Sequence, residues 1–507
     1  MFYNYLVNRM VDIVVMDSKT SHWKHEKYVE FYRDLTDTSA EYWGIGIENE
    51  TYLMFKQQNP VEKRFILENR MPERYSVDYW KNYKEDELMK TLAYLPDTIM
   101  VPTYINAYMF QNSDMYGEHK KLYNTRLTAN PKSHGFTMDQ YLRFVSPVVS
   151  RLFEKNMIYD GDAFEFTTFN FYKTNVQTAV NELKTIKATF LKEVNSKLVD
   201  KEFVLNKEVI YPPYNYGFAK HISNPKNIAT CNNGTYHINI TLPTALDVSR
   251  GIADPDKFRR VHANAIRAIQ WIEPLLAGVY GSPDILYVMN PDYSGGSQRL
   301  SLSRYIGMGT YDTEKMEKGK ILDTFDYTQH STYFKELHRD SPYVTPEKIG
   351  YDFNYNKFLK HGIELRILDS FPEEYLESVI NLIILVCEIS TYKDIPDPTE
   401  YVAWNEMAMS CLRYGSDSRL GPNIYNMVYA IFDMNPCYWW PFQYSEPPIN
   451  VLRRIANHLY YYFSKGVVSK KLSPNMRPIE LHNVNLETKE LFRDLLRPLK
   501  NKNNDVD

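Results

Sequence analysis

Four short segments of the chain alternate apolar residues with charged or metal-ligating ones. They are 44–53 (GIGIENETYL), 162–167 (DAFEFT), 235–241 (TYHINIT) and 362–368 (GIELRIL). This alternation predicts β-strands with one apolar face and one polar face, because successive side chains of a strand point to opposite sides. Strands of this kind are typical of antiparallel sheets, which often pack only one face on the core.

The polar faces of these strands carry an unusual set of side chains. They are Glu48, Glu50, Glu165, His237, Asn239, Thr241, Glu364 and Arg366. A solvated face is the simpler explanation for any one strand, but such a face favours Lys, Thr, Ser and Gln. Glutamates gathered on one surface repel one another unless cations compensate them. If the strands are neighbours, the pattern predicts a site for hard divalent ions such as Mg²⁺ or Mn²⁺.

The chemistry expected of such a site is phosphoryl transfer. Carboxylate-held Mg²⁺ that keeps several waters typically handles polyphosphate substrates. Arg366 lies two residues after Glu364 on the same face and could neutralise a transferring phosphoryl group. The chain has only 20 glycines in 507 residues, with neither a Walker A sequence nor a kinase-type glycine loop. The phosphates would therefore be held by metal ions and arginines.

The order of these motifs resembles that of the glutamine synthetase-type carboxylate–amine ligases. The similarity is greatest to their glutamate–cysteine ligase and amidoligase branch. It rests on Gly46-Ile47-Glu48-Asn49-Glu50, on Glu165, on His237-Ile238-Asn239 and on Glu364-Leu365-Arg366. It extends as separate islands over residues 40–390.

The resemblance implies an α+β fold in which a curved antiparallel sheet forms a half-barrel funnel with helices on its outer face. It implies ATP-dependent amide formation through an acyl phosphate, with ATP and two or three Mg²⁺ as cofactors and Mn²⁺ as an alternative ion. The implied metal ligands are Glu48, Glu50, Glu165, His237 and Glu364. Arg366 would stabilise the transferred phosphoryl group, with Glu364 and Glu50 as further catalytic groups. Asn239 and Thr241 would line the nucleotide pocket, and Arg299 or Arg304 would hold the substrate carboxylate.

Other functions stay open at this point. A phosphagen-kinase-like phosphotransferase shares the sheet type, and a non-catalytic binding or structural protein could retain the fold. A glycosidase would use paired glutamates but leaves His237 and Arg366 without a role. The acceptor could be an amino acid, an amine or a protein side chain, and the Tyr-rich segment 52–150 has no assigned role.

Hydrophobic periodicity predicts helices around the strands and a mainly helical C-terminal region. The expected helices cover residues 137–155, with a kink or a split at Pro147, and residues 174–195, 254–277 and 376–389. We expect a helical lead-in over 1–40, a catalytic domain over 41–395, a helical region over 396–499 and a disordered tail over 500–507. His262 is expected to be structural, and Gly295-Gly296 to form a turn rather than a mobile loop over the site.

Charge and cysteine content narrow the partners and the compartment. The chain has 59 Lys and Arg against 63 Asp and Glu, a net charge of −4, which disfavours binding to nucleic acid. Its four cysteines are too few for a disulfide framework, and no apolar stretch approaches the roughly 20 residues that cross a bilayer. We therefore expect a cytoplasmic protein that acts on small-molecule or peptide substrates without a membrane. An oligomer is compatible with the sequence.

Overall fold

The computed structural model describes most of the central and C-terminal parts of the chain. The described residues are 41–56, 59–62, 98–101, 104–112, 137–160, 163–168, 175–199, 208–215, 234–245, 247–248, 252–288, 291, 294–302, 308–318, 352–355, 362–434, 444–463 and 473–495. The predicted lead-in, the predicted tail, Arg304 and most of the Tyr-rich segment lie outside them.

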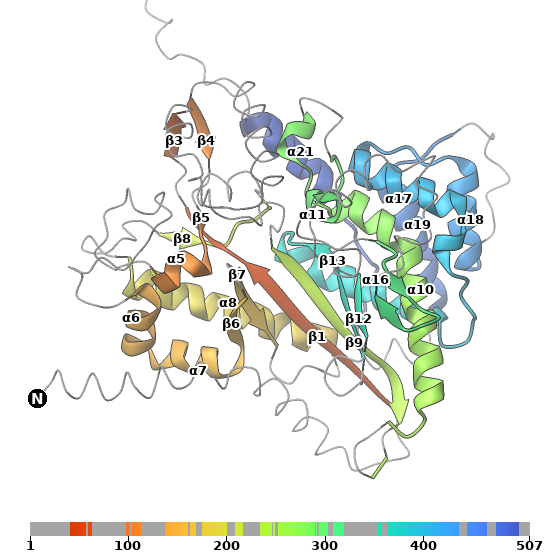
Figure 1. Cartoon of the computed structure of the whole chain (residues 1–507), viewed down its shortest axis with the longest axis horizontal. Coiled ribbons are helices and arrows are strands. Elements are labelled where there is room, and N and C mark those ends of the chain that lie inside the picture. Colours follow the sequence, from red (N-terminus) through yellow and green to blue (C-terminus); the bar gives the residue numbers. More distant parts are fainter. Residues whose placement is uncertain are drawn as a thin grey trace, which may run out of the picture.

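The centre of the molecule is a six-stranded antiparallel sheet (Figure 1). Its strand order is β12-β13-β9-β1-β7-β6. The strands are β1 (Glu41–Thr51), β6 (Met157–Asp160), β7 (Ala163–Thr167), β9 (Thr235–Ala245), β12 (Phe353–Tyr355) and β13 (Ile363–Asp369). All four predicted strands are confirmed, and they lie next to one another as β13, β9, β1 and β7.

One strand ends earlier than predicted. The alternating segment 44–53 is not a single strand, because β1 ends at Thr51 and Leu53 begins β2 (Leu53–Phe55). β2 belongs to a second sheet, between β5 (Tyr104–Ile105) and β8 (Val209–Ile210). The alternation continues through this change of partner, so the sequence pattern does not reveal it.

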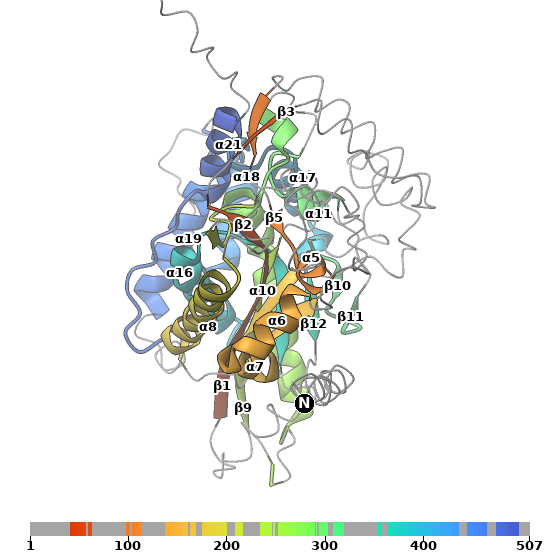
Figure 2. The same cartoon turned by 90° about the vertical axis from the view of Figure 1, so that its left-hand side faces the viewer.

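Helices cover the apolar face of the sheet. Ile45, Ile47, Ile238 and Ile240 are almost fully buried there and belong to one hydrophobic core. The covering helices are α8 (Val176–Lys197), α10 (Pro255–Tyr280) and α16 (Leu376–Ile389), of which α8 and α16 are neighbours (Figure 2). These helices confirm three of the predicted helical segments, and they leave the opposite face for the polar side chains.

Of the two outcomes predicted at Pro147, a kink or a split, the structure shows the split, between α6 (Met138–Val145) and α7 (Pro147–Lys155). Ser146 has an extended backbone and accepts a hydrogen bond from the Val149 N–H, so it caps α7. Pro147 takes the first helical position, where its missing N–H costs nothing.

The C-terminal part is mainly helical, as predicted, with α17 (Val402–Tyr414), α18 (Pro422–Ile431), α19 (Pro448–Phe463) and α21 (Val484–Leu495). All four pack against α10. The Trp404 indole N–H donates to the Gln270 carbonyl at 2.9 Å, and that of Trp271 donates to the Pro396 carbonyl at 3.0 Å. The predicted boundary at residue 396 therefore lies inside a shared core.

The remaining elements are short. They are β3 (Asn59–Glu62), β4 (Thr98–Val101), β10 (Tyr311–Asp312), β11 (Glu317–Lys318), α5 (Ala107–Asn112), α11 (Gln298–Leu302) and 3-10 turns at Ile285–Val288, Glu373–Tyr375, Pro398–Glu400 and Gly415–Asp417. Among the residues that the structure describes, no helix is both long and apolar enough to span a membrane.

Candidate metal centre

Strand register brings the predicted site residues together on the polar face of the sheet. Glu48 on β1 lies directly opposite His237 on β9, and Asn239 lies opposite Glu364 on β13. Glu50 lies opposite Glu165 on β7. Directly opposed residues of an antiparallel pair share a face, so side chains from four strands converge on one surface.

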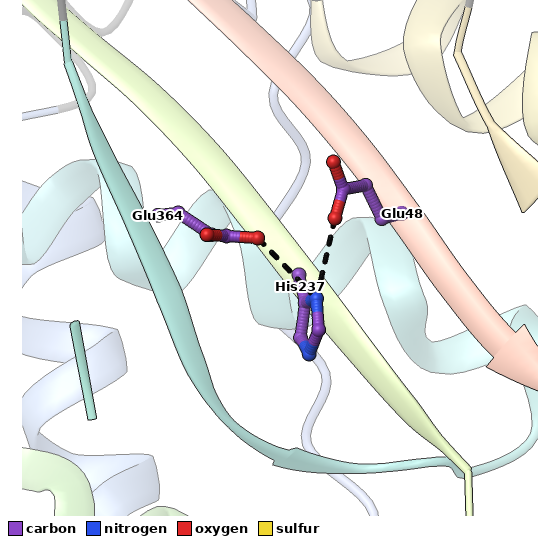
Figure 3. A group of neighbouring side chains, drawn as sticks. All are labelled: Glu48, His237 and Glu364. Atoms are coloured by element: carbon purple, nitrogen blue, oxygen red, sulfur yellow. Dashed lines mark hydrogen bonds and ion pairs between the residues drawn. The ribbon is translucent and has the colours of Figure 1, made fainter. Parts of the chain in front are cut away.

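Glu48, His237 and Glu364 form the centre of this cluster (Figure 3). His237 Nδ1 lies 3.3 Å from Glu48 Oε2 and 3.3 Å from Glu364 Oε1. One ligand atom from each of these residues fits within a span of 4.8 Å. Two carboxylates and one imidazole on rigid neighbouring strands are a suitable donor set for Mn²⁺ or Mg²⁺.

The second pair of predicted carboxylates lies beside this group. Glu50 Oε1 is 3.7 Å from His237 Nε2, on the other side of the imidazole from Glu48. Glu50 and Glu165 are 6% and 5% exposed, so two opposed carboxylates are held together with little access to water. This arrangement suits a second cation, because like charges buried at close range need compensation.

The His237 imidazole responds to these carboxylates. Burial, the largest influence, lowers its pKa, and Arg366 lowers it further. Hydrogen bonds to Glu364 and Glu48 and the charge of Glu50 outweigh both, so the pKa of His237 is raised above its usual value. The carboxylates thus favour the protonated form of the imidazole, and a metal ion would compete with that proton for the ring nitrogen.

Asn239 has polar capacity that the described protein does not use. Its side chain is fully buried, yet among the described residues neither its amide nitrogen nor its amide oxygen finds a hydrogen-bond partner. Burying an amide without hydrogen bonds is costly, so such groups are rare in folded proteins. Its position opposite Glu364 and Gly46 places this unused capacity within the cluster. The chemistry of the cluster therefore fits a bound ion or polar ligand.

The two predicted arginines that the structure describes differ in exposure. Arg366 is partly exposed, with 24% of its side chain accessible, and its guanidinium lies 3.2 Å from Glu364 Oε1. Arg299 is 2% exposed and donates to Thr235 Oγ1 and to the Arg366 carbonyl, both at 3.0 Å. Burial lowers the pKa of Arg299 to about 10, while Asp369 and Glu50 act in the opposite direction. Arg299 thus lies close enough to the cluster to interact with Glu50, but its hydrogen bonds go to other groups of the protein.

Thr241 lies at the far end of the same face. It is 1% exposed and pairs with Gly44 on β1. This pair lies two residues along the strands from the pair of Asn239 and Gly46. The structure therefore places Thr241 next to Asn239 along β9, farther from the carboxylates.

Two further residues of the site carry no motif in the sequence. The Asn354 amide on β12 donates to Glu364 Oε2 at 3.1 Å. Asp369, at the end of β13, accepts hydrogen bonds from the Ser282 N–H and from Ser297 Oγ, both at 2.7 Å. The position of Asn354 depends on the pairing of β13 with the three-residue strand β12, and that of Asp369 depends on the irregular register of β13. Alternation in the sequence could therefore indicate neither residue.

The expectation that His262 is structural is confirmed. Its Nδ1–H donates to the Phe258 carbonyl at 2.8 Å, and its Nε2 accepts from the Leu242 N–H at 3.2 Å. Burial lowers the pKa of His262 to about 3. The ring is therefore neutral and fixes α10 against β9.

The chain is similar to a known viral protein. No family model matches the chain. The uncharacterized protein R704 of Acanthamoeba polyphaga mimivirus is 36% identical over 473 residues, which cover 91% of this chain and 81% of R704. On this similarity, the chain belongs to the same protein family as R704.

Proposed function

We propose that the protein is an ATP- and Mg²⁺-dependent carboxylate–amine ligase that forms an amide bond through an acyl phosphate. One observation carries this proposal: the four motif strands are neighbours, and their Glu48, Glu50, Glu165, His237 and Glu364 side chains share one face. The motif order resembles that of the glutamine synthetase-type ligases. We also propose that the sheet corresponds to their half-barrel funnel, with α8, α10 and α16 on its outer side.

The proposed ligands form two groups. Glu48, His237 and Glu364 would hold one ion, while Glu50 and Glu165 would hold another between β1 and β7. Such ions would bind the polyphosphate of ATP and offset the charge that develops during transfer.

The remaining residues would act on the substrates. Arg366, partly exposed beside Glu364, would stabilise the phosphoryl group as it moves to the substrate carboxylate. Asn239, whose amide has no partner among the described residues, would bind the nucleotide or a metal-bound water. We propose a small-molecule or peptide carboxylate and an amine as substrates, in the cytoplasm.

The experiment is ATP turnover with pooled carboxylate and amine acceptors, followed by mass spectrometry of the products. We expect ADP, phosphate and an amide. Glu364→Gln and Glu48→Gln should each lower turnover by roughly 100-fold or more, because the isosteric amide removes a charged ligand. Glu388→Gln is the matched control, since Glu388 is also buried, at 5% exposed, but lies on α16.

Each other result has a definite meaning. Unchanged turnover in Glu364→Gln would contradict the proposal. A phosphorylated acceptor without an amide would instead support the phosphagen-kinase-like phosphotransferase. Failure to bind Mg-ATP in calorimetry would favour a non-catalytic protein that retains the fold.

A further inference from the structure

We propose that Arg299 is a positioning residue, which holds a bulge in β13 and thereby orients Arg366 over the carboxylate cluster. The inference rests on the proposed function, because it assigns Arg366 a part in phosphoryl transfer. It replaces the expectation that Arg299 binds the substrate carboxylate.

The bulge follows from the register of β13 and β9. Leu365 pairs with Ile238, and Leu368 pairs with Tyr236. Two residues of β13, Arg366 and Ile367, therefore lie opposite the single residue His237. A bulge of this kind changes the direction of a side chain and interrupts the ladder of main-chain hydrogen bonds. Arg366, the phosphoryl-stabilising residue of the proposal, occupies the bulge itself.

Arg299 replaces the hydrogen bonds that the bulge disrupts. One nitrogen of its guanidinium donates to the Arg366 carbonyl at 3.0 Å and approaches the Leu368 carbonyl at 3.4 Å. The same nitrogen donates to Thr235 Oγ1, on the neighbouring strand, at 3.0 Å. Arg299 thus joins both sides of the bulge to β9 and fixes the main chain from which the Arg366 side chain extends.

The extra residue also determines which side chains share the face. Glu364 and Asp369 are five positions apart and would point to opposite faces in a regular strand. Because of the bulge, Glu364 pairs with Asn239 and Asp369 pairs with Thr235, so both lie on the polar face. The Asp369 carboxylate attracts the Arg299 guanidinium, so β13 itself supplies a counter-charge for the side chain that holds its bulge.

The segment that carries Arg299 is anchored from the C-terminal helices. The Gly295 and Gly296 N–H groups donate to the carbonyls of Arg413 and Leu412 on α17, at 2.7 and 2.9 Å. The Asn485 amide on α21 donates to the Gly295 and Gly296 carbonyls, each at 2.9 Å. A side chain at Gly296 would place its Cβ 2.1 Å from the Cys411 carbonyl oxygen, so this close approach requires glycine. The expected turn is therefore a fixed support.

Burial and geometry favour positioning over substrate binding. Arg299 is 2% exposed, whereas Arg366 has 24% of its side chain accessible. The guanidinium nitrogen that makes all three contacts lies one atom farther along the side chain than the ammonium nitrogen of a lysine, so a lysine cannot reach the same acceptors in the same geometry.

The test is Arg299→Lys, which keeps the charge and shortens the side chain by one atom. We expect kcat for ATP turnover to fall roughly tenfold or more, with the KM for each substrate within about twofold of the wild type. In an Arg366→Ala background, Arg299→Lys should change kcat by less than about twofold further, because Arg299 acts through Arg366. A raised KM for the carboxylate substrate, or fully additive losses in the double variant, would overturn the proposal.

Hydrogen exchange provides a readout that needs no activity. Without denaturant and near pH 7, Arg299→Lys should speed amide exchange at residues 365–368, while the exchange rates in β1 stay the same. Arg453→Lys is the matched control, because Arg453 on α19 also donates to a main-chain carbonyl, that of Leu481, but in the C-terminal region away from the sheet. Equal exchange rates at residues 365–368 in both variants would contradict the proposal that Arg299 holds the bulge. A wild type without ATP turnover would contradict the ligase alone, and the exchange result would still decide the role of Arg299.

Discussion

Two buried asparagines show how differently this molecule treats its polar groups. Asn485, on α21, has its Oδ1 accepting from the Ser416 N–H and its Nδ2 donating to the carbonyls of Gly281, Gly295 and Gly296. Asn239, on β9, is equally inaccessible, and among the described residues its amide has no partner at all. Asn485 supports the fold, and its hydrogen-bonding groups are satisfied by it. Asn239 lies on the polar face of the sheet and keeps capacity for something that the described residues do not supply.

The two buried histidines repeat this contrast. His262 uses both ring nitrogens on main-chain groups and is held neutral. His237 faces Glu48, Glu50 and Glu364, and its pKa is raised by them despite burial. The rings lie on the two elements that pack together, α10 and β9, so burial alone does not distinguish a structural histidine from a ligand. The partners do.

The largest expected effect is on the saturated asparagine. Asn485→Ala leaves three carbonyls and one N–H without their partner, so we expect a loss of about 3–5 kcal/mol in the free energy of unfolding. Asn239→Ala removes an amide that has no hydrogen bond to the described residues, so we expect a change within about 1 kcal/mol. Urea denaturation of both variants measures the difference. Equal losses would show that Asn239 also serves the fold.

The sequence predicts the cluster on the polar face of the sheet well, but it does not predict the hydrogen bonds of Asn485. Alternation on the four strands is enough to predict Glu48, Glu50, Glu165, His237 and Glu364 as one cluster, because each strand displays its own polar face and the resemblance supplies the order. The pairing of Asn485 with Gly295 and Gly296 joins segments 189 and 190 positions apart. Main-chain acceptors leave no trace in side-chain pattern, so no motif could predict it.

The role that we propose for Arg299 differs from the role expected from the sequence, for a related reason. Charge type and position favoured a substrate ligand, but its acceptors are the carbonyls of a bulge, and a bulge depends on the pairing of two distant strands. Asp369 illustrates the same limit: its parity in the sequence differs from that of Glu364, although both lie on one face. Register carries this information, and local pattern does not.

Metal binding should give the next largest effect on stability, and it should depend on the residues of the polar face. Mn²⁺ at about 100 times its dissociation constant should stabilise the wild type by roughly 2.7 kcal/mol, because it binds the folded state. Glu364→Gln should lose most of this gain, while Glu388→Gln should keep it. Thermal unfolding with and without Mn²⁺, against a chelator control, measures the shift. A gain that survives Glu364→Gln would place the ion elsewhere.

The smallest effect concerns the neutral histidine and its dependence on pH. The folded pKa of His262 is about 3, below its ordinary value of 6.5, so the unfolded chain binds a proton that the native protein does not. Stability from this residue is therefore present above about pH 6.5 and is lost as the pH falls toward about 3. Between about pH 7 and pH 5 the wild type should lose roughly 2 kcal/mol more than His262→Gln, whose amide does not titrate. Urea denaturation across this range gives the two slopes. Parallel slopes would mean that the ring is not held neutral by Phe258 and Leu242, and the contrast with His237 would then fail.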